Sequence, residues 1–597
     1  MTWTMALDSL WSLLYNARPA WWDSRLTIAG FAILPLLLLL LMYHLMSLNA
    51  DRAQSGGKTP PQVPYFFPFV GNTIVFAFDG RTFLKGCLRR YGKMTPFRLW
   101  VGMETYYYIP QGEMVQAMVK KSRELTSKPL VLKVFRDQFL MPAKDLAVYE
   151  RDHSGIHSRP HKGTEDMDPA QRIFFHQHRI QIDSLNGSSL STLVSRFTAN
   201  YTAKLQTTST LSNDGTWVEL PDLFEFFKSE MFHATTTAVC GEHIFKVCPD
   251  FSSVFWDFDR NIMTYLRTVP RLFAPKAHAI RDQAIALVKK WQLWAATRFD
   301  VYAEDFTEPD YEPIWGSRYI RSRARLDKDL GISADGSAGA ELGLIWGANA
   351  NVIPGMIWAL LQIHLSDNLT ERVRAETMAC WDVNKGKGWF DVHALASKPL
   401  LSSIFLEALR YSVAGTSARN PLTDDFEIDG WKMERNSVVM SISWLGHRDE
   451  TFWNEGRILA SGAPEHPVDS FWAERFLEYP DDPLSGPFRK ADSVLRSAEP
   501  ARDKTVEDDK TAKIITEGIQ GHWYPFGGGS HICPGRHFAK YAVLAGLAIT
   551  MKELEIELVN RDFARETRPD LREFPVGTLP PTRAVPVRVR QRRDSAL

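Results

Sequence analysis

The longest uninterrupted run of hydrophobic positions lies near the start of the chain, at residues 26–48. It contains no Asp, Glu, Lys or Arg, and it is long enough for a helix to cross a bilayer, which takes roughly 20 residues. A cleaved signal peptide is the alternative, but such segments have a shorter apolar run and a small-residue cleavage site soon after it. The pattern predicts a transmembrane anchor at 26–48, behind a short N-terminal segment at 1–25.

A proline-rich segment separates this run from the rest of the chain. Its prolines are Pro60, Pro61, Pro64 and Pro68. Prolines at this density cannot continue a helix and favour a stiff, extended connection. We expect a linker at 49–72, followed by one large domain at 73–597.

Behind the linker, amphipathic stretches with the period of a helix outnumber short segments that alternate like strands. The clearest helical stretches are 342–365 and 402–411. Strands are expected at 426–431, 437–443 and 556–559, and in AVPVRVRQR near the C-terminus. The pattern predicts a mainly α fold with a smaller β-rich region.

Two hydrophilic stretches interrupt this pattern, at 152–172 and 490–517, and we expect both to be surface loops. The first contains His153, His157 and His161. These histidines are four residues apart, but they lie in a loop that contains Gly, Pro and Ser rather than on a helix, and no thiol is beside them, so solvated loop residues are the simpler interpretation.

Composition and charge mainly exclude classes of protein: they argue against a nucleic-acid-binding protein, a disulfide-rich protein and a structural zinc site. The 70 basic residues balance 70 acidic ones, so no net charge favours nucleic acid as a partner. The cysteines are Cys87, Cys240, Cys248, Cys380 and Cys533. Their odd number and scattered positions do not suggest a disulfide framework, and no pair has the spacing of a structural zinc site.

Cys533 differs from the other cysteines in its surroundings, Phe526-Gly-Gly-Gly-Ser-His-Ile-Cys-Pro-Gly-Arg-His-Phe-Ala539. The glycines allow the backbone to approach a flat ligand closely. A helical run follows, and the N-terminus of a helix stabilises a thiolate. A structural cysteine beside a turn is the alternative; Cys248-Pro249, with no glycines around it, is an example of that pattern.

This run resembles the haem-binding loop of the cytochrome P450 superfamily, usually FxxGxRxCxG, with His531 in the place of the arginine. The resemblance implies the P450 fold and a haem b, iron protoporphyrin IX, whose iron is bound by Cys533. It also implies that His531 lies near a haem propionate and that Phe526 packs beside the sulfur.

Two further segments match the family in the same order along the chain. Glu407 and Arg410 resemble its Glu-x-x-Arg motif, and they share one helical face because they are three residues apart. The segment FWAERF is similar to the family's PERF segment and contributes Arg475. The resemblance implies that these three residues form a structural network behind the haem pocket.

The stretch at 342–365 resembles the oxygen-binding helix of the family but departs from its usual pattern. Gly347 supplies a small residue, Ala350 stands where an acid is usual, and Asn351 replaces the alcohol. Asn351 can form a hydrogen bond with bound oxygen but has no titratable proton. Pro354 has no N–H, so the helix should kink near Ala350 and leave room for oxygen and water. A buried helix whose Asn caps a local irregularity is the alternative.

The WxxxxNxxP arrangement of this stretch is similar to the group that contains sterol 7α- and 12α-hydroxylases and prostacyclin synthase. That likeness implies a bulky terpenoid, steroid or other lipophilic substrate. Arg179 resembles the arginine of the family's WxxxR segment, and Arg419 stands where residues that bind a propionate often lie. Both are candidate haem-binding residues, and 413–418 and 576–578 are expected to face the substrate.

The resemblance implies a membrane-bound monooxygenase that uses O2 and electrons passed from NADPH through a reductase. We expect a single-pass protein of the endoplasmic reticulum with a cytosolic catalytic domain. The sequons at Asn186, Asn200 and Asn368 should then carry no glycans. A haem-thiolate isomerase or dehydratase that acts on a peroxide without a redox partner is the alternative. A non-catalytic haem sensor would leave the anchor and the helix kink without a purpose.

Overall fold

The computed structural model describes residues 34, 37–49, 59–212, 214–302, 310–381, 390–499 and 501–592. The chain divides into two units. Unit 1 consists of Met1–Pro110 and Thr423–Val439, and unit 2 of Gln111–Leu422 and Met440–Leu597. Every site residue predicted from the sequence belongs to unit 2.

Unit 1 is built on an antiparallel hairpin of β1 (Phe97–Val101) and β2 (Glu104–Tyr108). The ring of Phe97 stacks on that of Tyr108, with the centroids 5.0 Å apart. Tyr91, at the end of α3 (Thr73–Tyr91), stacks on the other side of Phe97 at 5.5 Å. Aromatic stacking therefore attaches the helix to the hairpin.

A second hairpin in unit 1 corrects the single strand predicted at 426–431. Two short strands, β8 (Glu427–Ile428) and β9 (Trp431–Lys432), pair antiparallel there. Asp429 and Gly430 join them with φ angles of 48° and 82°. Asp-Gly is a strong signal for a two-residue hairpin turn, because such turns need positive φ at both central positions.

The predicted anchor lies only partly within the described residues. Leu37–Asn49 is a short apolar helix, and the rest of 26–48 apart from residue 34 lies outside the described part. In that part, only Ala334–His364 is long and apolar enough to cross a membrane, and 72% of its most apolar window is buried. Such burial is typical of a core helix, so the anchor at 26–48 stays a prediction.

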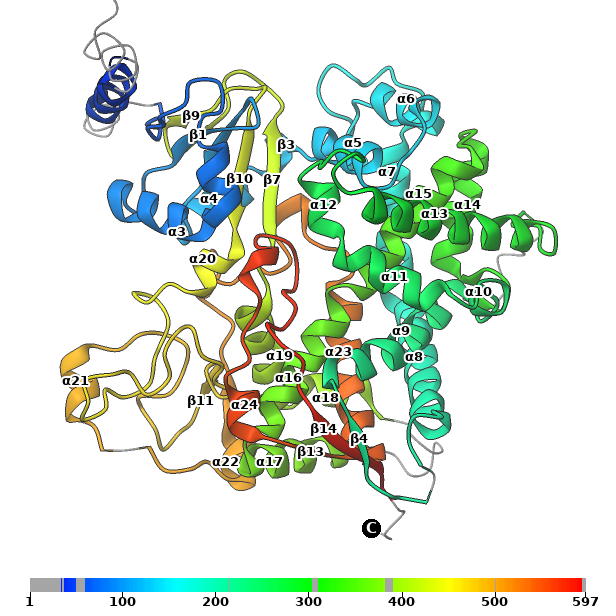
Figure 1. Ribbon diagram of the computed structural model, residues 1–597, viewed down its shortest axis with the longest axis vertical. Helices are drawn as coiled ribbons and strands as arrows, with labels where there is room; N and C mark the ends of the chain where they lie inside the picture. Colours follow the sequence, from blue (N-terminus) through cyan, green and yellow to red (C-terminus); the bar gives the residue numbers. More distant parts are fainter. Residues whose placement is uncertain are drawn as a thin grey trace, which may run out of the picture. The chain divides into compact units, whose positions relative to one another are not determined.

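Helices make up most of unit 2 (Figure 1). The first group is α4 (Glu113–Lys120), α5 (Lys128–Asp137), α6 (Ala143–Arg151), α7 (Ile173–Ser184), α8 (Gly187–Thr207), α9 (Leu223–Cys240), α10 (His243–Val247), α11 (Phe251–Arg260), α12 (Ile262–Leu266), α13 (Pro275–Ala296) and α14 (Arg318–Asp329). The second group is α15 (Ala334–Asn349), α16 (Val352–His364), α17 (Asp367–Met378), α18 (Val392–Ser397), α19 (Pro399–Ser412), α20 (Ser443–His447), α21 (Asp492–Ser497), α22 (Val506–Thr511), α23 (Arg536–Glu553) and α24 (Arg561–Arg565).

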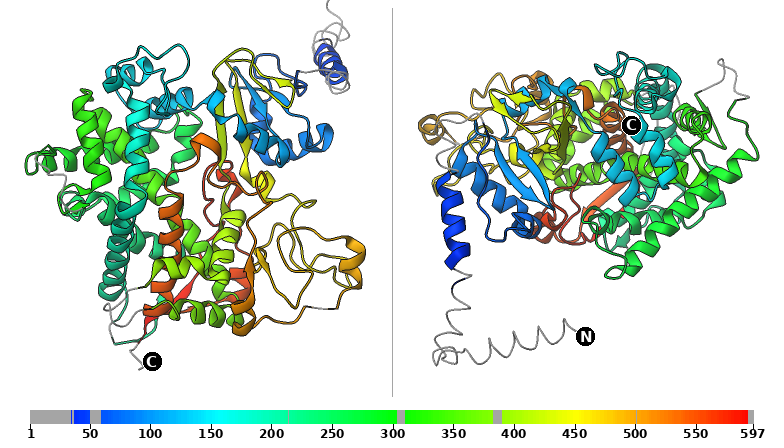
Figure 2. Two further views of the ribbon diagram at one scale, coloured as in Figure 1. Left: turned by 180° about the vertical axis from the view of Figure 1, so that it is seen from behind. Right: turned by 90° about the horizontal axis from the view of Figure 1, so that it is seen from above.

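The core of unit 2 lies where α8, α9, α16, α19 and α23 pack together. α8 and α23 lie side by side both from the front (Figure 1) and from behind (Figure 2). Tyr201 of α8 and Thr550 of α23 join their hydroxyls at 3.0 Å. On α16, the fully buried Trp358 packs edge-on against Tyr411 of α19 with the ring centroids 5.4 Å apart. α19 also contains the helix predicted at 402–411.

Strands occupy a smaller part of unit 2, as expected for a mainly α fold. β3 (Leu125–Thr126) pairs with β7 (Thr416–Pro421), β5 (Tyr311–Glu312) with β6 (Gly316–Ser317), and β11 (Leu477–Glu478) with β12 (Lys513–Ile514). β13 (Leu554–Leu558), β14 (Val587–Gln591) and β4 (Val218–Leu220) form an antiparallel sheet. β10 (Val438–Ile442), β13 and β14 confirm the strands predicted at 437–443, at 556–559 and near the C-terminus.

The second hydrophilic insert is more ordered than the surface loop predicted for 490–517. It contains α21, α22 and β12, and Thr505 and Asp508 form a capping box at the start of α22. Asp509 is buried and its carboxylate lies 2.7 Å from the guanidinium of Arg372 on α17. The prediction of a surface loop was wrong because it treated every charged residue of the segment as solvent-exposed, whereas Asp509 forms an ion pair in the interior.

Candidate functional site

Cys533 lies between the short 3-10 turn η4 (Gly529–His531) and the first turn of α23. Its backbone N–H donates to the carbonyl of Phe526 at 3.0 Å, which closes the loop predicted to carry the site. The side chain of Cys533 is exposed, whereas the other four cysteines are buried. Exposure at the start of a helix leaves this thiol accessible to a ligand.

Desolvation nevertheless raises the pKa of the Cys533 thiol, and the N–H groups of Gly535 and Arg536 and the charge of Arg536 only partly oppose it. A side chain that is accessible and also desolvated lies in a recess of the protein rather than on its outer surface. The backbone N–H groups that favour the thiolate are those expected at a helix N-terminus. The recess therefore presents a thiol that binding to a metal ion would convert to the thiolate.

The glycines of this loop allow close contact with η1 (Ser122–Glu124) and the end of α4. Gly529 has a φ of 63°, and a Cβ on Gly528 would come 2.6 Å from a methyl group of Val119. The N–H of Ser530 donates to the hydroxyl of Ser122 at 3.0 Å. The loop is therefore held by backbone contacts that a larger side chain would break.

Arg419 of β7 meets this loop from the other side. Its guanidinium donates to the carbonyl of His531 at 3.2 Å and to that of Ala418 at 2.6 Å. Desolvation lowers the pKa of Arg419 to about 10, and no acidic side chain among the described residues is paired with it. A half-buried cation without a counter-charge, beside an accessible thiol, is suited to an anionic group.

His531 contributes an imidazole to the same place. Its ring nitrogens lie 3.3 Å from the carbonyl of Leu125 and 3.5 Å from the hydroxyl of Ser127. Desolvation and the charge of Arg419 lower the pKa of His531 to about 4, so the ring is neutral at physiological pH. The structure thus brings His531, Arg419 and Cys533 into one neighbourhood.

Arg179 does not join this neighbourhood. It lies on the outer face of α7, with 65% of its side chain exposed, and its Nε donates to Asp183 at 2.8 Å. His178 and His157 are instead near enough to His531 to contribute to its low pKa. The sequence analysis missed His178, because adjacent residues of a helix point about 100° apart and the WxxxR likeness selected the wrong face. It assigned His157 only to a solvated loop.

Glu407, Arg410 and Arg475 form a fully buried network. Arg410 donates to both carboxylate oxygens of Glu407, at 2.6 and 2.8 Å, and Arg475 donates to one of them at 3.2 Å. Desolvation alone would raise the pKa of Glu407, but the two guanidiniums outweigh it and the pKa is lowered. Arg410 also donates to carbonyls of His447 and Val468, both at 2.7 Å. These bonds fix loops around α19.

The apolar helix predicted at 342–365 is interrupted at the kink expected from Pro354. α15 ends at Asn349, and α16 begins at Val352 with Asn351 at its N-cap. Gly347 is exposed, and a Cβ placed there would meet nothing within 4 Å. One side of this core helix therefore borders open space just before the break.

Asn351 is held by the loop at 576–578. Its side-chain oxygen accepts the N–H of Thr578 at 2.8 Å, and its carbonyl accepts the Thr578 hydroxyl at 3.1 Å. Gly577 has a φ of 54°, and a Cβ there would collide with that same side-chain oxygen. The Asn351 side chain thus binds the loop at 576–578 and makes no capping hydrogen bond to α16, and the described structure gives its NH2 group no hydrogen-bond partner.

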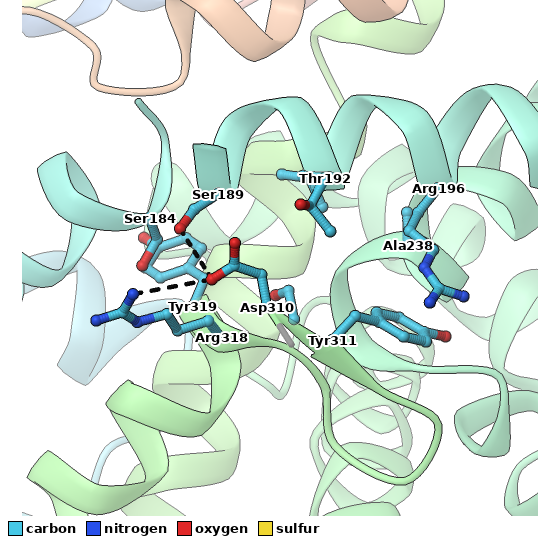
Figure 3. A pocket seen from close by; sticks show the side chains of 11 residues that line it. Ser184, Ser189, Thr192, Arg196, Ala238, Asp310, Tyr311, Arg318 and Tyr319 are labelled. Carbon is cyan, nitrogen blue, oxygen red and sulfur yellow. Dashed lines mark hydrogen bonds and ion pairs between the residues drawn. The ribbon is translucent and has the colours of Figure 1, made fainter. Parts of the chain in front are cut away.

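A separate small pocket opens between α7, α8 and α14 and contains none of the predicted site residues (Figure 3). There Asp310 accepts a hydrogen bond from Ser189 at 3.2 Å and lies 3.8 Å from Arg318. Arg196 lies over the ring of Tyr311 at 4.1 Å. The Asp310 carboxylate is therefore already bound by a hydroxyl and lies near a guanidinium, and the Arg196 guanidinium lies against an aromatic ring.

Comparison with known proteins gives consistent matches. The sequence profile of the Cytochrome P450 family matches residues 330–457. Cytochrome P450 monooxygenase fsoE of Humicola fuscoatra is 33% identical over 552 residues, covering 91% of this chain and 90% of the relative. Cytochrome P450 monooxygenase efuG of Hormonema carpetanum is 31% identical, covering 91% of this chain and 92% of its own length. Cholesterol 7-alpha-monooxygenase of Cricetulus griseus is 25% identical over 41% of this chain and 43% of its own length.

Proposed function

The chain belongs to the cytochrome P450 family and is a monooxygenase, and on that premise we propose that Cys533 binds the haem iron of an enzyme that oxidises a bulky apolar metabolite. The observation that carries the proposal is the position of Cys533, the one accessible thiol, in a desolvated recess at the start of α23. The four buried cysteines are unsuited to the role because a ligand cannot reach them.

The residues around Cys533 fit a haem b. Arg419 supplies a desolvated cation for a haem carboxylate, and the neutral imidazole of His531 lies beside it with its one N–H directed to the carbonyl of Leu125. Phe526, whose ring packs against Trp523 at 6.2 Å, covers the loop that carries the thiol. A haem with a thiolate ligand supplies the redox chemistry, because the thiolate pushes electron density onto iron and favours O–O cleavage.

The break between α15 and α16 is the proposed oxygen-binding region, where Gly347 leaves space for small molecules and Asn351 offers its NH2 group as a hydrogen-bond donor. Neither Asn351 nor Ala350 can supply a titratable proton, so protons reach this place through water or another side chain. The proposed reaction uses O2 and two electrons that a membrane-bound reductase passes from NADPH.

The substrate class and location rest on likeness. Cholesterol 7-alpha-monooxygenase, one of the relatives, acts on a sterol, which supports a steroid, terpenoid or similar lipophilic substrate for this chain. The apolar helix Leu37–Asn49 supports the proposed single-pass anchor at 26–48, with the catalytic part on the cytosolic side of the endoplasmic reticulum. Nucleic acid has no place in this proposal.

A second candidate is an isomerase or dehydratase that acts on a peroxide. The absence of an acid–alcohol pair at Ala350 and Asn351 favours it, because such a reaction needs no protons delivered to oxygen. The two candidates share Cys533 and differ in their need for a reductase.

The test is a ferrous–carbon monoxide difference spectrum of membranes that contain the full chain, reduced with NADPH and reductase before dithionite is added. A red-shifted thiolate band with NADPH supports the monooxygenase, and a band only with dithionite favours the isomerase. Cys533→Ser should abolish the band, whereas the control Cys248→Ala should keep it. If Cys533→Ser kept the red-shifted band of the wild type, the assignment of Cys533 as the iron ligand would be refuted.

A further inference from the structure

Trp346 carries an unexpected polar contact one residue before the open space at Gly347. Its indole Nε1 donates to Oδ1 of Asp259 at 2.8 Å. Asp259 lies on α11 and Trp346 on α15, so the bond joins two helices distant in sequence. Both side chains are half-buried, in contrast to the fully buried Ile345 beside Trp346.

Asp259 has no ion-pair partner among the described residues, although it is desolvated. Burial raises its pKa, and the Trp346 hydrogen bond and the charges of Lys228 and Arg260 only partly offset this. Those cations are already engaged: Lys228 lies 3.0 Å from Glu225, and Arg260 pairs with Asp257. The described structure gives Oδ2 of Asp259 no donor, yet Oδ2 is not sealed from solvent.

The carboxylate is near the segments that surround the proposed reaction site. Asp259 contributes to the raised pKa of Glu573 in η5 (Leu571–Glu573), so the two side chains are close. Arg267, just after α12, donates to the carbonyl of Arg572 at 3.4 Å and joins the same segment to η5. The chain then runs from η5 to Thr578, which binds Asn351.

We propose that Asp259 is a substrate-binding residue whose free oxygen accepts a hydrogen bond from a hydroxyl group on an otherwise apolar substrate, with Trp346 as its positioning residue. This inference rests on the proposed function and adds a polar anchor for the lipophilic substrate that the family likeness implies. Because no protein group donates to the accessible Oδ2, water serves as its donor in the free protein, and a ligand hydroxyl can take the place of that water. The fields of Lys228 and Arg260 already partly balance its charge, so a neutral hydroxyl suits it better than a cation.

Trp346 determines where this anchor points. Because Oδ1 is bound to the indole, the carboxylate cannot turn freely, and Oδ2 keeps one direction. A hydroxyl held there would fix one end of the substrate relative to the site. The anchor would therefore select which carbon of a rigid skeleton reaches the site.

The test uses the purified, haem-loaded full chain and matched probes: steroid, triterpene and sesquiterpene alcohols, each with its O-methyl ether. Binding is measured from the substrate-induced shift of the haem absorption band. In the wild type, the tightest alcohol should bind on the order of tenfold more tightly than its ether, as expected for one hydrogen bond to a charged acceptor.

Asp259→Leu should reduce this preference to about twofold or less, and Asp259→Asn and Trp346→Phe should reduce it partly. Affinity for the ether should stay unchanged in Trp346→Phe, a result that a purely structural role for Trp346 would not give. Asp257→Asn, on the exposed side of the same helix, is the control and should keep the full preference.

Two outcomes overturn the proposal: an undiminished preference in Asp259→Leu, or a wild type that prefers no alcohol of the panel over its ether. The carbon monoxide band is recorded for every variant. A variant with the normal thiolate band is folded and retains Cys533 ligation, so its altered selectivity concerns Asp259 alone. Absence of the band in the wild type would instead reject the proposed function.

Discussion

Arg419 and Arg179 are both candidates by motif, but their surroundings predict opposite effects on haem binding. Arg419 is desolvated and lacks an acidic partner among the described residues, whereas Arg179 is exposed and paired with Asp183. Arg419→Leu should weaken haem retention roughly tenfold or more, because a charged hydrogen bond to a carboxylate is lost. Arg179→Leu should leave retention unchanged. The haem-to-protein ratio after gel filtration measures both, and equal losses would contradict the assignment.

His466 gives a pH-dependent prediction remote from the haem. Its ring stacks on Trp472 at 4.3 Å, and desolvation lowers its pKa to about 4. An unfolded histidine titrates near 6.5. As the pH falls from about 6.5 to about 4, the unfolded chain therefore binds a proton that the folded chain does not, and stability decreases. Urea unfolding at pH 7 and pH 5 should show a smaller loss for His466→Gln than for the wild type; equal losses would refute this.

Residue types alone were sufficient to select Cys533, because a run of glycines and a following helix make an unusual local signal. They were insufficient for Arg179 and for Asp259. Choosing between His178 and Arg179 depends on the rotation of α7 about its axis, which a motif does not specify. The hydrogen bond between Asp259 and Trp346 joins residues far apart in the sequence, and no local sequence pattern at either position predicts it.

At the scale of single elements, α19 depends on the pairing of its Glu407 and Arg410. Glu407→Ala would leave two buried guanidiniums without their carboxylate, and such a loss typically costs about 3–5 kcal/mol. The matched control is Glu507→Ala on α22, where Glu507 and Lys510 have the same spacing but are exposed. Exposed pairs contribute about 0–1 kcal/mol. Thermal unfolding should show a large decrease only for Glu407→Ala.

The break between α15 and α16 should depend on the bond from Asn351 to the loop at 576–578. Asn351→Ala removes the acceptor of the Thr578 N–H, so this N–H should exchange with solvent faster. The free energy of unfolding should fall by roughly 1 kcal/mol. Hydrogen exchange of a peptide that covers 575–579 measures the effect. Unchanged exchange would mean that the loop is held by other contacts, such as the bond from Ala414 N–H to Gly577.

Periodicity anticipated the long elements better than the short ones. The kink within 342–365 follows from Pro354 alone, and the structure shows the break near the expected place. The segment at 426–431 was misassigned because its alternation resembled a strand, although Asp429-Gly430 is a turn signal of two residues. In a segment this short, the residues that favour a turn determine the structure more strongly than the alternation of apolar and polar residues does.

Considered as a whole molecule, the chain has its predicted site residues in unit 2 and its apolar N-terminal helix in unit 1. The proposed topology places the catalytic part in the cytosol, where Asn186, Asn200 and Asn368 cannot be glycosylated. Asn200 already donates its NH2 to the carbonyl of Ala234 at 3.4 Å. Endoglycosidase treatment of native membranes should leave the electrophoretic mobility unchanged, and a shift would contradict the topology.

The contact between Asn351 and Gly577 has a consequence for how the sequence can change. The amide oxygen occupies the place where any side chain at 577 would begin, so a substitution at Gly577 requires a smaller residue at 351, in addition to the backbone strain that a φ of 54° imposes on any other residue. A smaller residue at 351, in turn, releases the loop unless something refills the gap. The two sites are therefore epistatic, and a directed-evolution library should randomise them together rather than one at a time.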